Sequence, residues 1–94
     1  MADRRYRIDI APAAARALEK LDKADQRRIR RAVDGLESEP RPRGALVLTG
    51  SESRLWRLRV GDYRVIYEIR DQKLTVLVIR IGHRGVVYRD ISGG

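Results

Sequence analysis

The chain has 94 residues with no cysteine and one histidine, and its formal net charge is +8 with a sequence pI near 10.8. This length supports one domain over residues 1–94, and the lack of cysteine excludes disulfides and thiolate metal sites. No apolar run is long enough for a membrane span, and the N-terminal segment MADRRYRIDI lacks the apolar core of a signal peptide. We therefore expect a cytoplasmic protein with no membrane partner. The positive charge predicts a polyanionic partner, either nucleic acid or an acidic protein.

The first part of the chain predicts one strand followed by two helices. Residues 5–10 alternate apolar and polar side chains, as a half-buried strand does. Pro12 suits the first position of a short helix, and Asp22 or Asp25 can cap a second helix that ends before Pro40. The linker between the helices is so short that they should form a hairpin. Arginines occupy the polar side of the second helix: Arg27, Arg28, Arg30 and Arg31.

The second part predicts three consecutive antiparallel strands. Gly61-Asp62 separates two alternating runs, 55–60 and 63–69, which is the signal for a tight hairpin. Residues 71–73 break the pattern before a third run, 74–81, rich in β-branched and aliphatic residues. The expected class is α+β, a twisted antiparallel sheet in β-α-α-β-β-β order with the helical hairpin packed on one face.

Two segments lie outside these regular patterns. Residues 45–53 are the least regular part of the chain, and we expect Leu46 and Leu48 to lie under the sheet. Beyond the third strand, residues 86–91 predict a short extended segment.

The alternation of side chains gives the two sheet faces different compositions. One face has the composition of a core: Trp56, Leu58, Val60, Tyr63, Val65, Tyr67 and Ile69. The other face carries Arg57, Arg59 and Arg64, with Glu68 as its acid. At the end of the third strand Arg80, Gly82 and Arg84 share one register and His83 takes the other. Converging arginines predict a phosphate-binding face, and the alternative is a set of solvated surface residues.

Catalysis by this chain would depend on arginine, tyrosine and histidine. One histidine, no cysteine and no clustered carboxylates give no metal set, and the serines lack an activating motif, so we expect no cofactor. Tyr88 either closes the edge of the core or transfers protons, with its pKa lowered by arginines that stabilise the phenolate. His83 either caps the end of the strand through a backbone hydrogen bond or transfers protons.

These residues resemble a known family. The segments WRLRVGDYRVIYEI and LTVLVIRIGHRGVVY, preceded by two helices, are similar to the RelE family of bacterial toxins within the RelE/ParE superfamily. The resemblance covers the chain from Tyr6 to about Tyr88. Its most specific parts are GDYRVIY at 61–67 and IGHR at 81–84 followed by Tyr88.

The resemblance implies the toxin of a type II toxin-antitoxin system. Such a toxin is a metal-independent endoribonuclease that cleaves mRNA in the ribosomal A site and so inhibits translation. In that family the ribose 2′-hydroxyl attacks the adjacent phosphate, and arginines suit the stabilisation of the pentacoordinate phosphorane. The implied partners are an acidic RelB-like antitoxin, in a toxin-antitoxin hetero-oligomer, and the ribosome with its mRNA.

The resemblance also assigns roles to single residues. Arg64 matches the family arginine after Gly-x-Tyr, Arg84 the arginine after the last strand, and Tyr88 the tyrosine proposed to help proton transfer. Arg57 aligns with one of two family lysines, and the second falls at Leu55, which has no charge. Because arginine keeps its proton, proton transfer falls to Tyr88 or His83. The candidate catalytic set is Arg57, Arg64, His83, Arg84 and Tyr88, and the candidate RNA contacts are Arg27, Arg31, Arg54, Arg59 and Arg80.

Two alternatives remain open. A ParE-like toxin on the same fold would bind DNA gyrase and cut nothing itself, and the missing lysine at Leu55 favours this reading. A non-catalytic basic module would use the same arginines only to hold RNA or an acidic protein. The chain also ends soon after Tyr88, so we expect no C-terminal helix of the kind seen in some relatives.

Overall fold

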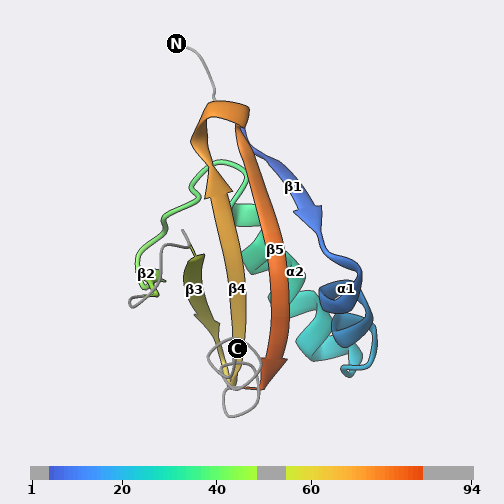
Figure 1. Ribbon diagram of the computed structural model, residues 1–94. Coiled ribbons are helices and arrows are strands. Elements are labelled where there is room, and N and C mark those ends of the chain that lie inside the picture. The colour runs from blue at the N-terminus through green and yellow to red at the C-terminus, as the bar shows by residue number, and fades with distance from the viewer. Residues whose placement is uncertain (1–4, 49–54, 84–94) are drawn as a thin grey trace.

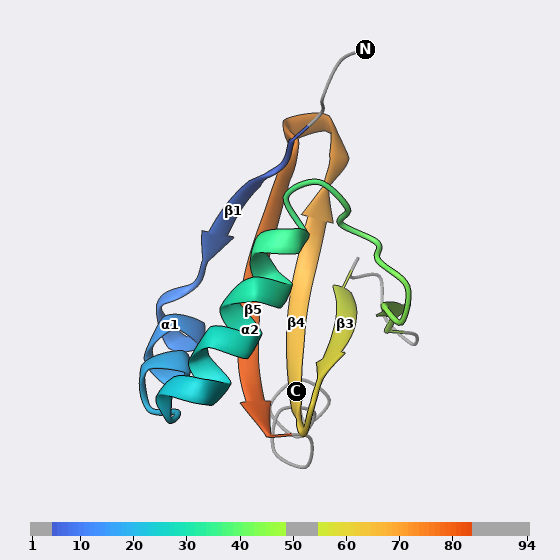
Figure 2. The same cartoon turned by 180° about the vertical axis from the view of Figure 1, so that it is seen from behind.

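A five-stranded sheet in the order β1-β5-β4-β3-β2 carries two helices on one face (Figures 1 and 2). The computed structural model describes residues 5–48 and 55–83. The elements in chain order are β1 (Arg7–Ile10), α1 (Pro12–Glu19), α2 (Lys23–Gly35), β2 (Leu46–Val47), β3 (Leu55–Val60), β4 (Tyr63–Arg70), a 3₁₀ turn (Asp71–Lys73) and β5 (Thr75–His83). The predicted α+β class, with a helical hairpin on one face, is confirmed.

Local signals in the sequence explain where the helices begin. Pro12 opens α1, where its fixed φ fits the helix and its missing N–H costs no hydrogen bond. Of the two predicted caps for α2, Asp22 is the one used, because its side chain accepts a 2.9 Å hydrogen bond from the Asp25 backbone N–H. Apolar residues at helical spacing, Leu18 in α1 with Ile29 and Val33 in α2, are buried against the sheet.

The predicted meander of β3, β4 and β5 is confirmed, but the sheet is mixed. Gly61 has φ +60° in the β3–β4 turn, a conformation that glycine adopts without steric cost. The expectation of a wholly antiparallel sheet was wrong for β1, which pairs in parallel with β5 through Arg7 opposite Thr75. β1 is separated from β5 by most of the chain, so no tight turn forces the two strands to run in opposite directions.

The expected position of Leu46 was also wrong. Leu46 lies in β2, a two-residue strand at the edge of the sheet, where its side chain is 54% exposed. β2 pairs in antiparallel fashion with β3, with Leu46 opposite Arg57 and Val47 opposite Trp56. The backbone of this segment therefore extends the sheet sideways instead of passing beneath it.

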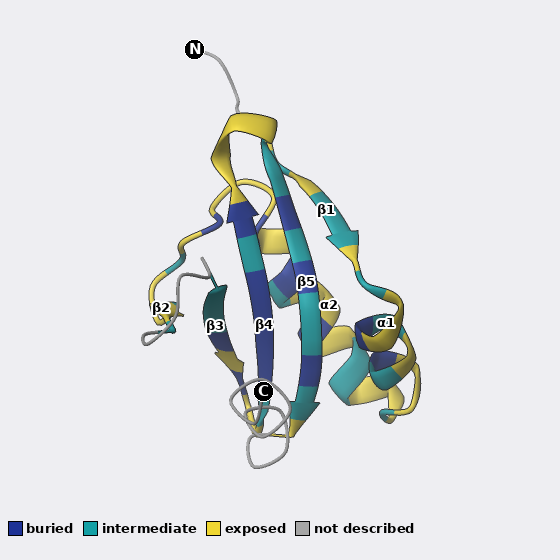
Figure 3. Ribbon diagram, in the orientation of Figure 1, coloured by how far each residue is buried: buried dark blue, intermediate teal, exposed yellow. Residues whose placement is uncertain are grey.

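The core lies between the helices and the sheet (Figure 3). The face predicted to be apolar is confirmed: Leu58, Val60, Val65, Tyr67 and Ile69 are buried. Trp56 and Tyr63 are partly buried and pack against this cluster. The arginine-bearing face therefore points away from the helices.

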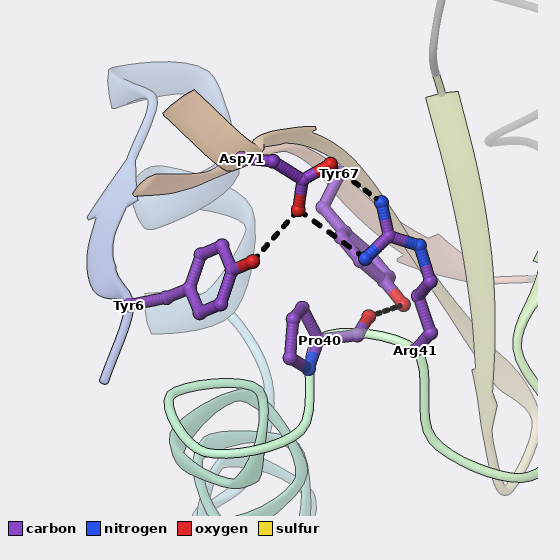
Figure 4. A network of polar contacts seen from close by, with 5 residues as sticks. All are labelled: Tyr6, Pro40, Arg41, Tyr67 and Asp71. Carbon is purple, nitrogen blue, oxygen red and sulfur yellow. Dashed lines mark hydrogen bonds and ion pairs between the residues drawn. The ribbon is translucent and has the colours of Figure 1, made fainter. Parts of the chain in front are cut away.

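A polar network joins three segments at one end of the sheet (Figure 4). Tyr6 donates a 2.7 Å hydrogen bond to Asp71 Oδ1, and Arg41 pairs with the same carboxylate, with Nη2 2.8 Å from Oδ2. The Arg41 guanidinium also lies 5.4 Å from the centre of the Trp56 ring. Asp71 raises the pKa of Tyr6, chiefly by accepting its hydrogen bond. The network ties the residue before β1 to the loop after α2 and the β4–β5 turn.

Candidate functional site

Two rows of side chains cross the sheet on the face opposite the helices. Residues paired across neighbouring strands point to the same side, so the pairing defines each row. The first row is Leu46, Arg57, Ile66 and Arg80, from β2, β3, β4 and β5. The second row is Arg59, Arg64 and Gly82, from β3, β4 and β5. We call Arg57, Arg59, Arg64 and Arg80 the arginine face.

A β-bulge in β5 completes the arginine face. Tyr67 pairs with Val78 but Ile66 pairs with Arg80, which leaves Ile79 as an extra residue in β5. Continuous alternation from Val78 would have placed Arg80 opposite Val65 on the helix side. Because of the bulge, Ile81 takes that buried position and Arg80 turns to the arginine face.

Arg64 is the buried charge of this face. Its side chain comes from the middle of the sheet and the residue is only 8% exposed. The Nε and Nη1 atoms are buried, and neither has a hydrogen-bond partner among the described residues. A buried guanidinium with unsatisfied donors is costly, since desolvation is not offset by hydrogen bonds or a counter-charge. An anion bound against Arg64 would supply both.

The neighbours of Arg64 increase the positive potential. Arg59 is paired directly opposite Arg64 and is exposed, and like charges in that position repel each other. Glu68, the acid predicted on this face, accepts a 3.0 Å hydrogen bond from Arg70 near the far end of β4. Within residues 5–48 and 55–83, neither Arg59 nor Arg64 forms an ion pair. This arrangement suits a phosphate, whose oxygens accept from several guanidinium groups at once.

His83 lies on the other face. It pairs with Tyr63, and the two rings meet edge to face with centroids 5.8 Å apart. The Tyr63 hydroxyl donates a 3.2 Å hydrogen bond to Asp25 of α2, so this pair belongs to the helix side. Burial and the nearby carboxylate of Asp25 raise the pKa of Tyr63. His83 is thus separated by the sheet from Arg57 and Arg64.

The predicted site residues therefore fall into three groups. The structure brings together Arg57, Arg59, Arg64 and Arg80 on one face. It places Arg27 and Arg31 on the exposed side of α2 and His83 beside Tyr63. Arg54, Arg84 and Tyr88 lie outside the described residues, as does the extended segment expected at 86–91. Leu46 joins the first row without having been predicted there, because residues 45–48 are all apolar and show no alternation that would assign a face.

Two absences among the described residues bear on the class of site. No group of three or more histidine, aspartate or glutamate side chains in this part of the chain is arranged to hold a metal ion. No described helix has the length and apolar character needed to cross a membrane.

Comparison with known proteins identifies the class of protein to which the chain belongs. Residues 8–88 match the family model described as the ParE toxin of the type II toxin-antitoxin system parDE. No curated protein matches the sequence. A chain of the archaeal RelE-RelB complex from Pyrococcus horikoshii OT3 is 36% identical, with a TM-score of 0.76, over 87% of this chain and 98% of that chain. A chain of the toxin-antitoxin complex RelBE2 from Mycobacterium tuberculosis is 30% identical, with a TM-score of 0.76, over 85% of this chain and 92% of that chain.

A more distant structure has the same fold. A chain of the intact E. coli RelBE toxin-antitoxin complex is 20% identical, with a TM-score of 0.70, over 83% of this chain and 95% of that chain. The fold and the match over most of the chain define the toxin component of a type II toxin-antitoxin system. The chain belongs to the RelE/ParE family of these toxins. The family resemblance noted in the sequence is confirmed.

Proposed function

We propose that this toxin is a ribosome-dependent endoribonuclease that cleaves mRNA in the A site and thereby inhibits translation in the cytoplasm. The observation that carries the proposal is the buried Arg64 guanidinium with two unsatisfied nitrogens, flanked by Arg59 and set beside the row that holds Arg57 and Arg80. The two relatives of at least 30% identity, from RelE-RelB and RelBE2 complexes, support the nuclease reading.

The proposed reaction uses the neighbouring ribose of the message as its own nucleophile. The 2′-oxygen forms a bond to phosphorus as the bond to the 5′-oxygen breaks, which leaves a 2′,3′-cyclic phosphate and a free 5′-hydroxyl. Negative charge grows on the non-bridging oxygens in the transition state, and Arg57 and Arg64 are the groups that would stabilise it. Arg59 and Arg80 would hold adjoining phosphates.

Protons must leave the 2′-hydroxyl and reach the 5′-oxygen. The arginines cannot exchange them, because a guanidinium stays protonated at any usual pH. We assign this role to Tyr88, with Arg84 as a further phosphate ligand, by their match to the family pattern. His83 is the weaker candidate, since its ring contacts Tyr63 on the helix side of the sheet.

We also propose a cognate antitoxin with an acidic segment. The Pyrococcus chain comes from a RelE-RelB complex, and the Mycobacterium and E. coli chains come from toxin-antitoxin complexes. A net charge of +8 would favour an acidic, partly disordered chain that folds as it binds.

The testing experiment is cleavage of a defined message by purified protein, with and without programmed ribosomes. We expect cuts only on the ribosome, and a loss on the order of 10²- to 10³-fold in Arg64→Ala. Arg70→Ala is the matched control, because Arg70 lies on the same strand and face but pairs with Glu68. An uncut message from folded wild-type protein would contradict the proposal.

The second candidate is a ParE-like toxin that binds DNA gyrase. The family model carries the ParE description, and Leu55 stands where RelE relatives are expected to have a lysine. Inhibition of gyrase supercoiling by the same protein preparation, together with an uncut message, would favour this function.

A further inference from the structure

A second positively charged site lies on α2, across the sheet from the arginine face. Ala24, Arg27, Arg28 and Arg31 line a surface depression of about 230 Å³. Their spacing of i, i+3, i+4 and i+7 puts them on one side of the helix, where the small Ala24 leaves room between the longer side chains. We call this depression the α2 cradle. Figure 2 shows α2 lying across one face of the sheet.

The arginines of the α2 cradle are not neutralised by ion pairs within the described residues. No aspartate or glutamate lines the depression, and within the described part of the chain none of its three arginines forms an ion pair or a side-chain hydrogen bond. Asp25, which lies on the same helix, donates its backbone N–H to the Asp22 side chain, and its carboxylate accepts a hydrogen bond from the Tyr63 hydroxyl. Three guanidinium groups within two helical turns repel each other, and a bound anion would relieve this repulsion.

One arginine connects the cradle to the end of the sheet. A Cβ built at Gly61 would lie 3.0 Å from Arg28 Nη1, so this guanidinium lies over the β3–β4 turn. Arg59 and Arg64 are the arginine pair nearest that turn on the opposite face. The α2 cradle and the arginine face therefore adjoin the same end of the sheet, one on each side.

We propose that the α2 cradle binds the phosphate backbone of structured RNA, as a second contact that holds the toxin on the RNA surrounding its message. This inference depends on the proposed function for its biological setting. An RNA backbone suits the cradle better than a protein does, because three of the four lining residues are arginines, and interfaces with nucleic acids are far more positively charged than interfaces between proteins. The contact is independent of base sequence, since guanidinium groups on phosphates carry no sequence information.

The test measures binding, so it does not depend on cleavage. The probe is a fluorescently labelled RNA hairpin, titrated by fluorescence anisotropy over a series of salt concentrations. The test variant is Arg27→Ala with Arg31→Ala, which leaves the Arg28–Gly61 contact intact. The control variant is Arg16→Ala with Arg43→Ala, which removes the same charge from two other exposed positions. Circular dichroism establishes that both variants are folded.

We expect the test variant to bind more weakly and with a shallower dependence of log K on log salt. The slope should fall by about 1.4 to 1.8, because each lost phosphate contact removes about 0.7 to 0.9. The control variant should lose less than half of this. Replacing both residues by lysine should restore most of the slope, since the charge returns. Equal slopes in the test and control variants would overturn the proposal.

Two further arms separate this proposal from its alternatives. Unchanged RNA binding, with weakened binding of an acidic helical peptide, would overturn it in favour of a protein-docking surface. In ribosome-dependent cleavage, the test variant should raise KM with little change in kcat, whereas Arg64→Ala lowers kcat. If wild-type protein cuts no message, the proposed function fails, and the salt slopes still decide whether the α2 cradle binds RNA.

Discussion

Arg57 and Arg80 lie on opposite sides of Ile66, in one row across β3, β4 and β5. Ile66 is fully buried although it belongs to the arginine face. A buried apolar residue between two guanidinium groups lowers the local dielectric and strengthens their interaction with a bound phosphate. The row therefore places two cations on either side of a residue that is not accessible to solvent.

The first prediction concerns Arg57. Arg57→Ala should reduce single-turnover cleavage on the ribosome by about 10²-fold, because one donor to the transition-state oxygens is lost. Arg57→Lys should retain most of the rate, since a lysine keeps the charge although it loses the planar fork. Wild-type cleavage in Arg57→Ala would remove this residue from the proposed site.

The second prediction separates function from stability at Arg64. Arg64→Met should reduce cleavage as strongly as Arg64→Ala and yet raise the free energy of unfolding by about 1 kcal/mol, because an unsatisfied buried charge is replaced by an apolar chain. Inorganic phosphate should raise the Tm of wild-type protein and have little effect on the variant, since only the wild type binds it strongly. Thermal and urea unfolding measure both effects.

Arg70→Met provides the comparison for this experiment. Arg70 is exposed and its ion pair with Glu68 contributes little. The phosphate response of Arg70→Met should match that of wild type. A phosphate-induced rise in Tm that survives in Arg64→Met would show that phosphate binds elsewhere on the protein.

The third prediction is the pH dependence of stability due to Tyr67. Burial raises the pKa of Tyr67 to about 12, whereas an exposed tyrosine titrates near 10. Above pH 10 the unfolded state releases this proton and the folded state keeps it. The stabilisation is therefore fully present below about pH 10 and is lost as pH rises through about 12, a change of roughly 2 to 3 kcal/mol.

Tyr67→Phe tests the contribution of that residue. At neutral pH the variant should be destabilised by about 1 kcal/mol, because the 2.8 Å hydrogen bond from the hydroxyl to the Pro40 carbonyl is lost. Its free energy of unfolding should fall less steeply than wild type at alkaline pH. Some slope should remain, since the pKa values of Tyr6 and Tyr63 are also raised. Parallel profiles for the two proteins would contradict the assignment.

The fourth prediction concerns the bulge at Ile79. Deleting Ile81 should restore continuous pairing and turn Arg80 toward Val65 in the core, which would cost several kcal/mol by burying a charge in place of an apolar side chain. Deleting Ile79 also restores continuous pairing, but it leaves Arg80 opposite Ile66 and Ile81 opposite Val65, so it should cost much less. Thermal unfolding followed by circular dichroism compares the two variants, and equal stabilities would mean that the register of β5 does not control the face of Arg80.

The amino-acid sequence by itself determined the local structure of this protein. Period-two alternation predicted β3 at Leu55–Val60 and the composition of both its faces, so Arg57, Arg59 and Arg64 could be assigned to one side in advance. Gly61 predicted the hairpin, and Asp22 was one of two expected caps for α2. These features depend on residues a few positions apart, which is the range over which sequence patterns are informative.

Only the tertiary structure decided how distant segments combine. The parallel pairing of β1 with β5, the edge position of Leu46 and the contact of His83 with Tyr63 all join residues that lie far apart in the sequence. The bulge at Ile79 is the clearest case, because Ile79 can be recognised as an extra residue only from the pairing of β5 with β4. The face of Arg80, and with it the full arginine face, follows from packing Ile81 into the core.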